Sequence, residues 1–475
     1  MVLRRIPLFI LFFSITMLSA QVNSPYSRYG LGNIFPTTFG ASNGLGGMSA
    51  AYFTPNNINY ANPASYADIS FTTFDVGAYG NVLTLENDLE SYTSGDGNLS
   101  YMAFGFPMLK KLRHSKFGLS FGLIPYSAFE YNIIQEEPTD DPVLGTKEYN
   151  YVGDGKLYQI YGGLGYKYQS DTIHTGKILN DEPVSATNIV SIGANAAQLF
   201  GSLYNITYAS FPEQVNSQTT KLTRSNNING GIYNMGIGLT RQYTRTSDVS
   251  RDYLVWRIGG SMSPQINVNG EQSVLWTNIF KTGNYESVTD TIYMEPDTSG
   301  NITLPASFQG GLAFSFFTTE QKAKNQFTLS AQYNRTNWSD YKGFQDAGKL
   351  GDSWRVTVGG ELFTKAKSAN TKVSEDKTQR VFNTAPWTIR FAVYSGQSNL
   401  IIDGVQLNDR GISTGFSVPL GVGKEVQSTL RNSRLNFFVN AGQRGSNTTI
   451  TETYYNFGVG FTIVDMGWFQ DYKLN

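Results

Sequence analysis

The chain has 475 residues, of which 15% are charged and 14% are aromatic, and its net charge is −1. Low charge combined with 31 Phe and 29 Tyr excludes a coiled coil, which needs abundant Ala, Glu, Lys and Leu, and a disordered chain, which has few aromatic residues. A net charge so close to zero provides no long-range attraction to nucleic acid, so no nucleic-acid partner is expected.

The sequence contains no cysteine and only two histidines, His114 and His174. Disulfides, thiolate metal sites and thiol nucleophiles are therefore excluded. Histidine is the commonest general base in enzymes, and neither histidine lies in a motif such as HExxH. We therefore expect no enzymatic activity, no cofactor and no metal.

Residues 1–20 have the three parts of a secretory signal peptide. Arg4 and Arg5 supply the positive charge, Ile6 to Leu18 the apolar stretch, and Ala20 ends a small-residue cleavage site. A membrane anchor is the alternative, but this apolar stretch is too short to cross about 30 Å of hydrocarbon as a helix. An exported chain without a long apolar helix either stays soluble or enters a membrane as a β-barrel.

The mature chain alternates with a period of two, which is typical of β-strands. In 233–239, for example, Tyr233, Met235, Ile237 and Leu239 alternate with Asn and Gly. A soluble β-sandwich also alternates, with its apolar face turned to a core. Three features favour an all-β transmembrane antiparallel barrel: strands of about ten residues, aromatic residues bracketing the apolar face, and Gly, Asn and Thr on the other face.

We predict fourteen strands, with sixteen as the alternative. They are expected near 71–85, 99–107, 115–125, 156–168, 188–203, 228–243, 251–263, 306–317, 325–336, 353–366, 387–395, 411–421, 432–442 and 452–464. An even number places both chain ends in the periplasm. Residues 273–282 are predicted to form a hairpin within the longest external loop, 264–305.

The chain divides into a signal peptide (1–20), an N-terminal hatch or plug (21–70), the barrel (71–464) and a short C-terminal extension (465–475). Residues 21–70 are rich in Gly, Asn, Pro and Ser and do not alternate, which would also suit a disordered tail. They carry more aromatic residues than a solvated tail should. A plug inside the barrel would bury them, and there irregular backbone is shielded from lipid.

Two N-terminal motifs carry a family resemblance. They consist of Ser24, Pro25, Tyr26, Arg28, Tyr29 and Gly30, and of Asn62, Pro63 and Ala64, which follow the glycine-rich GLGGMSAAYF. In this order before the first strand, they resemble the hatch of FadL-type outer-membrane transporters. The opening motif and the C-terminal Gly442-Gln443-Arg444-Gly445 resemble a Bacteroidota branch of that family, related to PorV, which carries cargo in type IX secretion. The chain departs from the pattern by continuing beyond its last aromatic strand position.

The resemblance implies a fourteen-strand barrel that passively imports fatty-acid-like hydrophobic compounds, with a sideways exit at a kink in the third strand. Pro125 lies near the outer end of the third predicted strand and could open the wall, since proline interrupts strand pairing. It could equally mark the point where the strand becomes a loop. Arg28 could hold the plug by pairing with a lumen carboxylate such as Glu361, or could bind a fatty-acid carboxylate.

Other charged residues fall on the predicted lumen face and are alternative partners for the plug. They are Lys167, Arg257, Arg355 and Arg390. Each could also be a simple wall residue.

Two functions remain open for a protein placed in the outer membrane of a Gram-negative bacterium, in contact with its lipid. The leading hypothesis, because it is the commoner role in the family that the chain resembles, is an uptake channel for hydrophobic small molecules, which predicts an apolar cavity continuous from the external loops to the plug. A PorV-like, non-transporting partner or scaffold in type IX secretion or outer-membrane assembly predicts a sealed lumen and an apolar external or lateral surface.

Overall fold

The computed structural model describes most of the chain from Pro25 to Asp465. The described residues are 25–86, 91–108, 114–140, 145–177, 183–212, 214, 217–246, 250–283, 285–320, 324–344, 350–364, 368–374, 377–382, 387–402, 404–420, 433–445 and 451–465. The predicted signal peptide, Ser24 and all of the predicted C-terminal extension except Asp465 lie outside them.

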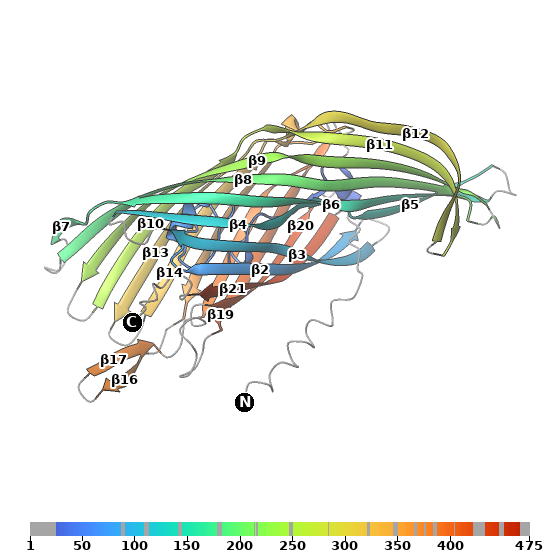
Figure 1. The fold of residues 1–475 in the computed structure, drawn as a ribbon. Helices are drawn as coiled ribbons and strands as arrows, with labels where there is room; N and C mark the ends of the chain where they lie inside the picture. The colour runs from blue at the N-terminus through green and yellow to red at the C-terminus, as the bar shows by residue number, and fades with distance from the viewer. Residues whose placement is uncertain are drawn as a thin grey trace.

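Fourteen antiparallel strands form a closed barrel wall (Figure 1). They are β2 (Thr72–Glu86), β3 (Ser91–Met108), β4 (Ser115–Ala128), β6 (Thr146–Gln169), β8 (Pro183–Ser210), β9 (Thr219–Thr246), β10 (Ser250–Ser263), β13 (Ser307–Glu320), β14 (Lys324–Thr336), β15 (Ser353–Phe363), β18 (Thr388–Ile402), β19 (Val405–Pro419), β20 (Arg434–Arg444) and β21 (Thr451–Asp465). Pairing of β2 with β21, from Thr72 opposite Asp465 to Glu86 opposite Thr451, closes the ring. The fourteen-strand prediction is confirmed.

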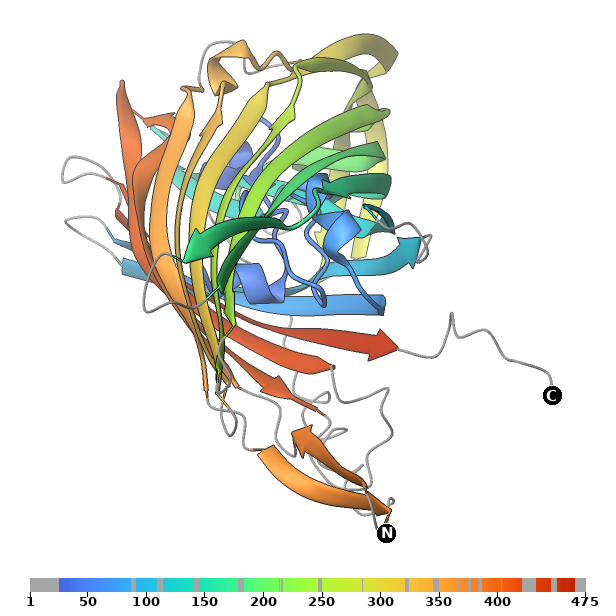
Figure 2. The same ribbon diagram turned by 90° about the vertical axis from the view of Figure 1, so that its left-hand side faces the viewer.

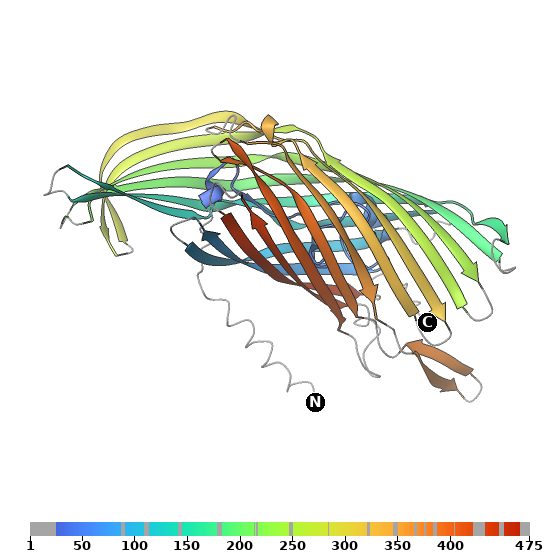
Figure 3. The ribbon, with the colours of Figure 1, turned by 180° about the vertical axis from the view of Figure 1, so that it is seen from behind.

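The predicted alternation matches the two faces of the wall. On β9, Tyr233, Met235, Ile237 and Leu239 are all exposed on the outside of the barrel, whereas Asn234 between them is buried. Figure 3 shows β13 to β21, yellow to dark red, lying side by side and tilted across the back of the barrel. A closed barrel with an apolar outer surface and a polar inner surface is built to cross a membrane.

Several strands continue far beyond the outer end of the wall. β8 and β9 have 28 residues each, which corresponds to a length of about 90 Å. Their outer parts and that of β6 join β5 (Tyr131–Pro138), β11 (Ile266–Thr282) and β12 (Tyr285–Leu304) in a curved sheet, here named the extension sheet (Figure 1). The prediction of a hairpin at 273–282 is wrong in its bounds: these residues all lie in strand β11, and the hairpin in the 264–305 loop is formed by β11 with β12.

Residues 25–71, here named the N-terminal segment, lie inside the barrel (Figure 2). Their elements are short: η1 (Pro25–Arg28), β1 (Asn33–Ile34), α2 (Gly40–Asn43) and η2 (Pro63–Asp68). The remaining elements lie between wall strands: β7 (Ile173–Lys177), η3 (Trp338–Asp340), β16 (Ser368–Ser374) and β17 (Lys377–Phe382). No helix in the described part of the chain is long and apolar enough to cross a membrane.

Glycines in the wall let the N-terminal segment approach the strands closely. A Cβ added at Gly259 on β10 would lie 1.9 Å from the carbonyl oxygen of Ala50, and one at Gly118 on β4 would lie 1.9 Å from that of Tyr66. Real Cβ atoms do not come this close, so the segment would have to move away from the wall.

The substitution Gly259→Ala is expected to lower the free energy of unfolding by about 1–3 kcal/mol, because the added methyl group has no room. Gly162→Ala is the matched control, since nothing lies within 4 Å of a Cβ built there. Urea unfolding of the two variants in detergent, followed by tryptophan fluorescence, measures the difference. Equal stability of the two variants would refute the close approach.

Candidate functional site

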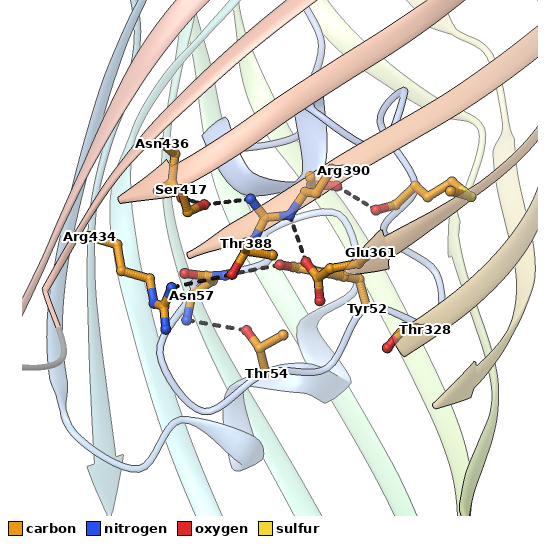
Figure 4. A network of polar contacts seen from close by, with 12 residues as sticks. Tyr52, Thr54, Asn57, Thr328, Glu361, Thr388, Arg390, Ser417, Arg434 and Asn436 are labelled. Atoms are coloured by element: carbon orange, nitrogen blue, oxygen red, sulfur yellow. Dashed lines mark hydrogen bonds and ion pairs between the residues drawn. The ribbon is translucent and has the colours of Figure 1, made fainter. Parts of the chain in front are cut away.

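A buried ion pair lies on the inner wall near the end of the lumen that is opposite to the extension sheet. Arg390 on β18 donates from Nε to Oε2 of Glu361 on β15 at 2.6 Å, and both residues are about 96–97% buried (Figure 4). Arg390 also donates to the Ser417 hydroxyl. Tyr52 of the N-terminal segment lies beside the pair in Figure 4. The ion pair links β15 to β18 next to the N-terminal segment.

The N-terminal segment is bound to the wall by polar side chains. Gln332 on β14 accepts from the backbone nitrogens of Ser49 and Ala50 at 2.7 and 2.8 Å. Lys167 on β6 forms an ion pair with Asp68. Tyr66 donates to Asn195 at 3.0 Å. These contacts reach opposite sides of the wall, so the segment spans the lumen.

The motif Asn62-Pro63-Ala64 begins helix η2. The Asn62 side chain accepts from the Ala64 nitrogen at 3.2 Å and donates to the carbonyl oxygens of Ala50 and Ile237 at 2.7 and 3.2 Å. It thereby caps the helix, holds a second part of the segment and contacts β9. Asn62 and Ala64 are completely buried.

A cavity of about 580 Å³ lies between the N-terminal segment and the outer end of the lumen. Arg355 and Arg444 on its wall pair with Asp409 at 2.5 Å and Glu452 at 3.3 Å. Tyr454 donates to Asp409 at 2.6 Å. The cavity surface therefore combines ion pairs and phenol groups with apolar side chains such as Leu83, Ile232 and Phe438.

Other polar atoms of the cavity wall have no hydrogen-bond partner among the described residues. They are Asn81 Oδ1, Gln159 Nε2, Asn234 Oδ1 and Arg444 Nε. All four atoms are shielded from solvent, so they do not form the surface that a molecule in the cavity would contact. The ion pairs of Arg355 and Arg444 are what give the cavity wall its charged character.

A hydrophobic cluster, here named the apolar cap, covers the outer mouth of the barrel. Its buried members come from the N-terminal segment, the extension sheet, the wall strands β18 and β19, and the connections between wall strands. They are Tyr26, Leu31, Phe129, Tyr131, Leu157, Leu199, Leu203, Ile228, Val268, Ile302, Leu304, Trp338, Tyr341, Leu350, Leu400 and Leu407. The apolar cap therefore packs the start of the N-terminal segment against side chains from distant parts of the chain.

The wall is closed between β3 and β4 over only part of their length. These strands pair only from Met102–Met108 to Phe117–Leu123, and the outer parts of the two strands separate. Pro125 lies just beyond this point, and a register shift follows it in the pairing of β4 with β6. We name the separation the wall gap; Pro125 thus lies where strand pairing is broken.

Polar and backbone contacts partly close the wall gap. Lys156 on β6 donates to Asn98 on β3 at 2.6 Å and pairs with Glu130 at 2.9 Å. The short strand β1 pairs with Ser127 and Ala128 on the free edge of β4. The N-terminal segment therefore occupies the edge that β3 leaves.

A family model described as BamG matches residues 1–475. The chain belongs to the BamG family. A closed, even-numbered antiparallel barrel with an apolar outer surface is the architecture of Gram-negative outer-membrane proteins, and this BamG-family chain is an outer-membrane barrel of that kind. The search of curated proteins returned no match.

Several solved structures are similar to the BamG-family chain at low identity. The toluene transporter TodX of Pseudomonas putida is 13% identical with a TM-score of 0.42, covering 90% of this chain and 98% of its own. A FadL homologue of Pseudomonas aeruginosa is 12% identical with a TM-score of 0.41, covering 92% and 99%. The CymD monoaromatic hydrocarbon channel is 14% identical with a TM-score of 0.38, covering 92% and 98%.

The hypothesis that Arg28 pairs with Glu361 is wrong for this BamG-family barrel. Arg28 is exposed near the outer mouth, where its guanidinium lies 5.1 Å from the ring centre of Tyr29, and Arg390 neutralises Glu361 at the other end of the lumen. Pro25 begins η1, and Gly30 has a φ of +61° and lies against Leu350 of the apolar cap.

The lumen charges fall into separate groups. Lys167, Arg355 and Arg390 each have a carboxylate partner, whereas Arg257 on β10 forms no ion pair with a described residue. The partners Asp68 and Asp409 and the bridging Lys156 were not predicted. Asp68 lies shortly before β2, and this position could have indicated that it reaches a charged residue on the inner wall. The pairing of Arg355 with Asp409 depends on strand register, which the sequence does not reveal.

Replacing Arg390 with Met is expected to lower the free energy of unfolding by about 3–5 kcal/mol, since Glu361 would remain buried without its partner. Adding Glu361→Leu should recover most of the loss. Arg410→Met, at an exposed position on β19, is the control and should change stability by no more than about 0.5 kcal/mol. Urea unfolding in detergent measures all three. If the double variant were as unstable as Arg390→Met alone, the buried unpaired Glu361 would not be the cause of the loss.

Asp352 holds the connection that supports the apolar cap. It accepts from the Ser339 hydroxyl at 2.6 Å and from the Ser339 nitrogen at 3.1 Å, and it pairs with Arg335 at 2.9 Å. The Ser339 hydroxyl, the Ser339 backbone and Arg335 lower the pKa of the Asp352 carboxyl below its ordinary value of 3.8.

Because the folded pKa of Asp352 is depressed, its stabilising effect is present above pH 3.8 and is lost as the pH falls through the folded value. Tryptophan fluorescence of the cap should therefore change at acidic pH in the native protein. In Asp352→Asn the change should be present at neutral pH already. Trp338→Phe controls for the reporter, and an acid transition unaltered by Asp352→Asn would contradict the assignment.

Proposed function

We propose that this outer-membrane barrel is a non-transporting partner protein, whose extension sheet binds another protein at the cell surface. The observation that carries the proposal is the extension sheet itself. Six strands rise beyond the apolar cap, and Tyr285, Val288 and Met294 on β12 are 85%, 61% and 68% exposed. Exposed apolar side chains outside the lipid belt are typical of protein interfaces.

The state of the lumen supports the same proposal. The N-terminal segment spans it, the apolar cap covers its mouth, and ion pairs line the cavity between them. These are features expected of a sealed scaffold. The partner would belong to outer-membrane assembly or to type IX secretion, as the resemblance to a PorV-related Bacteroidota branch implies, and no catalytic step is involved.

Purification of the full chain from its own outer membrane in mild detergent, followed by native mass spectrometry, tests the proposal. We expect a protein partner in stoichiometric amount. Removing residues 274–295, between the paired Gln272 and Thr298, should release the partner because it removes the tip of the β11–β12 hairpin. Removing the β16–β17 hairpin is the matched control. A lipid-like ligand in the lumen without a protein partner would overturn the proposal.

A second function is favoured by one observation, the wall gap between β3 and β4. A fatty-acid-like or other small hydrophobic compound could pass sideways there, with Pro125 at the point of separation and outer-membrane lipid outside. The bridge from Lys156 to Asn98 would then have to open. The charged cavity makes this function the weaker of the two.

Because the chain has no cysteine, the pair Asn98→Cys and Lys156→Cys can be joined selectively by a reducible cross-linker that reacts with two thiols and spans the wall gap. If hydrophobic compounds pass there, cross-linking should reduce uptake of a fluorescent fatty acid into proteoliposomes, and reductive cleavage should restore it. Each single variant is a control. Equal uptake in the cross-linked and cleaved double variant would exclude this route.

A further inference from the structure

Strand β12 is an outer edge of the extension sheet. It pairs with β11 along its length, and its other edge has backbone pairing with the described residues only at the bridge between Thr303 and Lys342. From Tyr285 to Ser299 every residue except the half-buried Glu295 is exposed. The strand therefore presents a long accessible edge far from the lipid belt.

The exposed part of β12 carries only negative charge. Its charged residues are Glu286, Asp290, Glu295 and Asp297, with no lysine or arginine. Glu286 is neutralised by Lys221 at 2.5 Å and accepts from Tyr208 at 2.9 Å. The other three carboxylates form no ion pair with a described residue, so their charge is available to a binding partner.

Apolar side chains lie between these carboxylates. Tyr285, Val288, Ile292, Tyr293 and Met294 are between 46% and 85% exposed. A surface that alternates unpaired carboxylates with exposed apolar groups binds best to a surface that brings both basic and apolar side chains. The same carboxylates repel a second copy of the strand, which argues against pairing between two of these chains.

Strand addition is limited along this edge. The β11–β12 pairing shifts register at three places, and Pro296 lacks a backbone donor. Bulges and proline protect an edge from regular pairing with another strand. Side chains rather than a continuous backbone ladder must therefore provide most of the binding.

We propose that the exposed edge of β12 is the docking site of the partner protein, and that the partner contributes a basic surface with apolar side chains between its positive charges. This inference rests on the proposed function and specifies the chemistry of its partner. Asp290, Glu295 and Asp297 recognise the positive charges, and the apolar side chains of β12 supply the buried contact.

The test uses the full chain in detergent and a defined probe, a labelled peptide of alternating lysine and valine, with a glutamate–valine peptide for comparison. Fluorescence anisotropy should show salt-sensitive binding of the lysine peptide only. The variant Asp290→Asn, Glu295→Gln, Asp297→Asn should weaken that binding about tenfold, since each exposed charge pair contributes a modest part of the affinity.

The opposite edge of the same sheet offers a matched control. Glu136→Gln, Glu137→Gln, Asp140→Asn removes the same number of carboxylates on and beside β5 and should leave binding unchanged. No binding of the lysine peptide, or an equal loss in both triple variants, would overturn the inference. If the β12 variant still retains the partner that purifies with the native chain, this inference fails while the proposed function stands.

Discussion

Irregular backbone inside a barrel must find a hydrogen-bond partner for every buried N–H and C=O group, and the arrangement of the lumen depends on this constraint. The N-terminal segment has few elements of its own, so side-chain amides of the wall and of the segment itself take that role. Gln332 receives two consecutive backbone donors, and Asn62 closes η2 while reaching β9. Wall glycines bring the strands close enough for these bonds to form. The polar side chains of the lumen thus supply hydrogen-bond partners that the backbone of the N-terminal segment needs.

Much of the fold was predictable because alternation reports which face of a strand meets lipid. Each of the fourteen predicted ranges overlaps one wall strand of the structure. The lipid-facing residues Tyr233, Met235, Ile237 and Leu239 were also identified correctly. The lengths of β8 and β9 were not predicted, since alternation continues past the membrane surface without a signal at its boundary. Those missed residues build much of the extension sheet.

The candidate site was less predictable for a different reason. A lumen charge can be assigned to the inner face from its phase, but its partner depends on register between strands that are distant in sequence. Arg390 and Glu361 are directly opposite each other on β18 and β15, so the carboxylate is already neutralised and Arg28 has no role there. Pro125 lies two residues beyond the last residue of β4 that pairs with β3, and it still lies opposite Tyr158 on β6.

Closure of the ring by β2 and β21 bears on how the molecule is assembled. Helix η2 contacts β4, β6, β8 and β9, whereas α2 contacts β19, β20 and β21, so the N-terminal segment binds both early and late strands. One edge of β2, the first wall strand, stays unpaired until β21, the last wall strand, is in place. Full binding of the N-terminal segment and pairing of β2 with β21 therefore depend on the same late strands. A folding barrel without its final hairpin would keep an unpaired sheet edge and a partly bound N-terminal segment, both accessible to assembly factors.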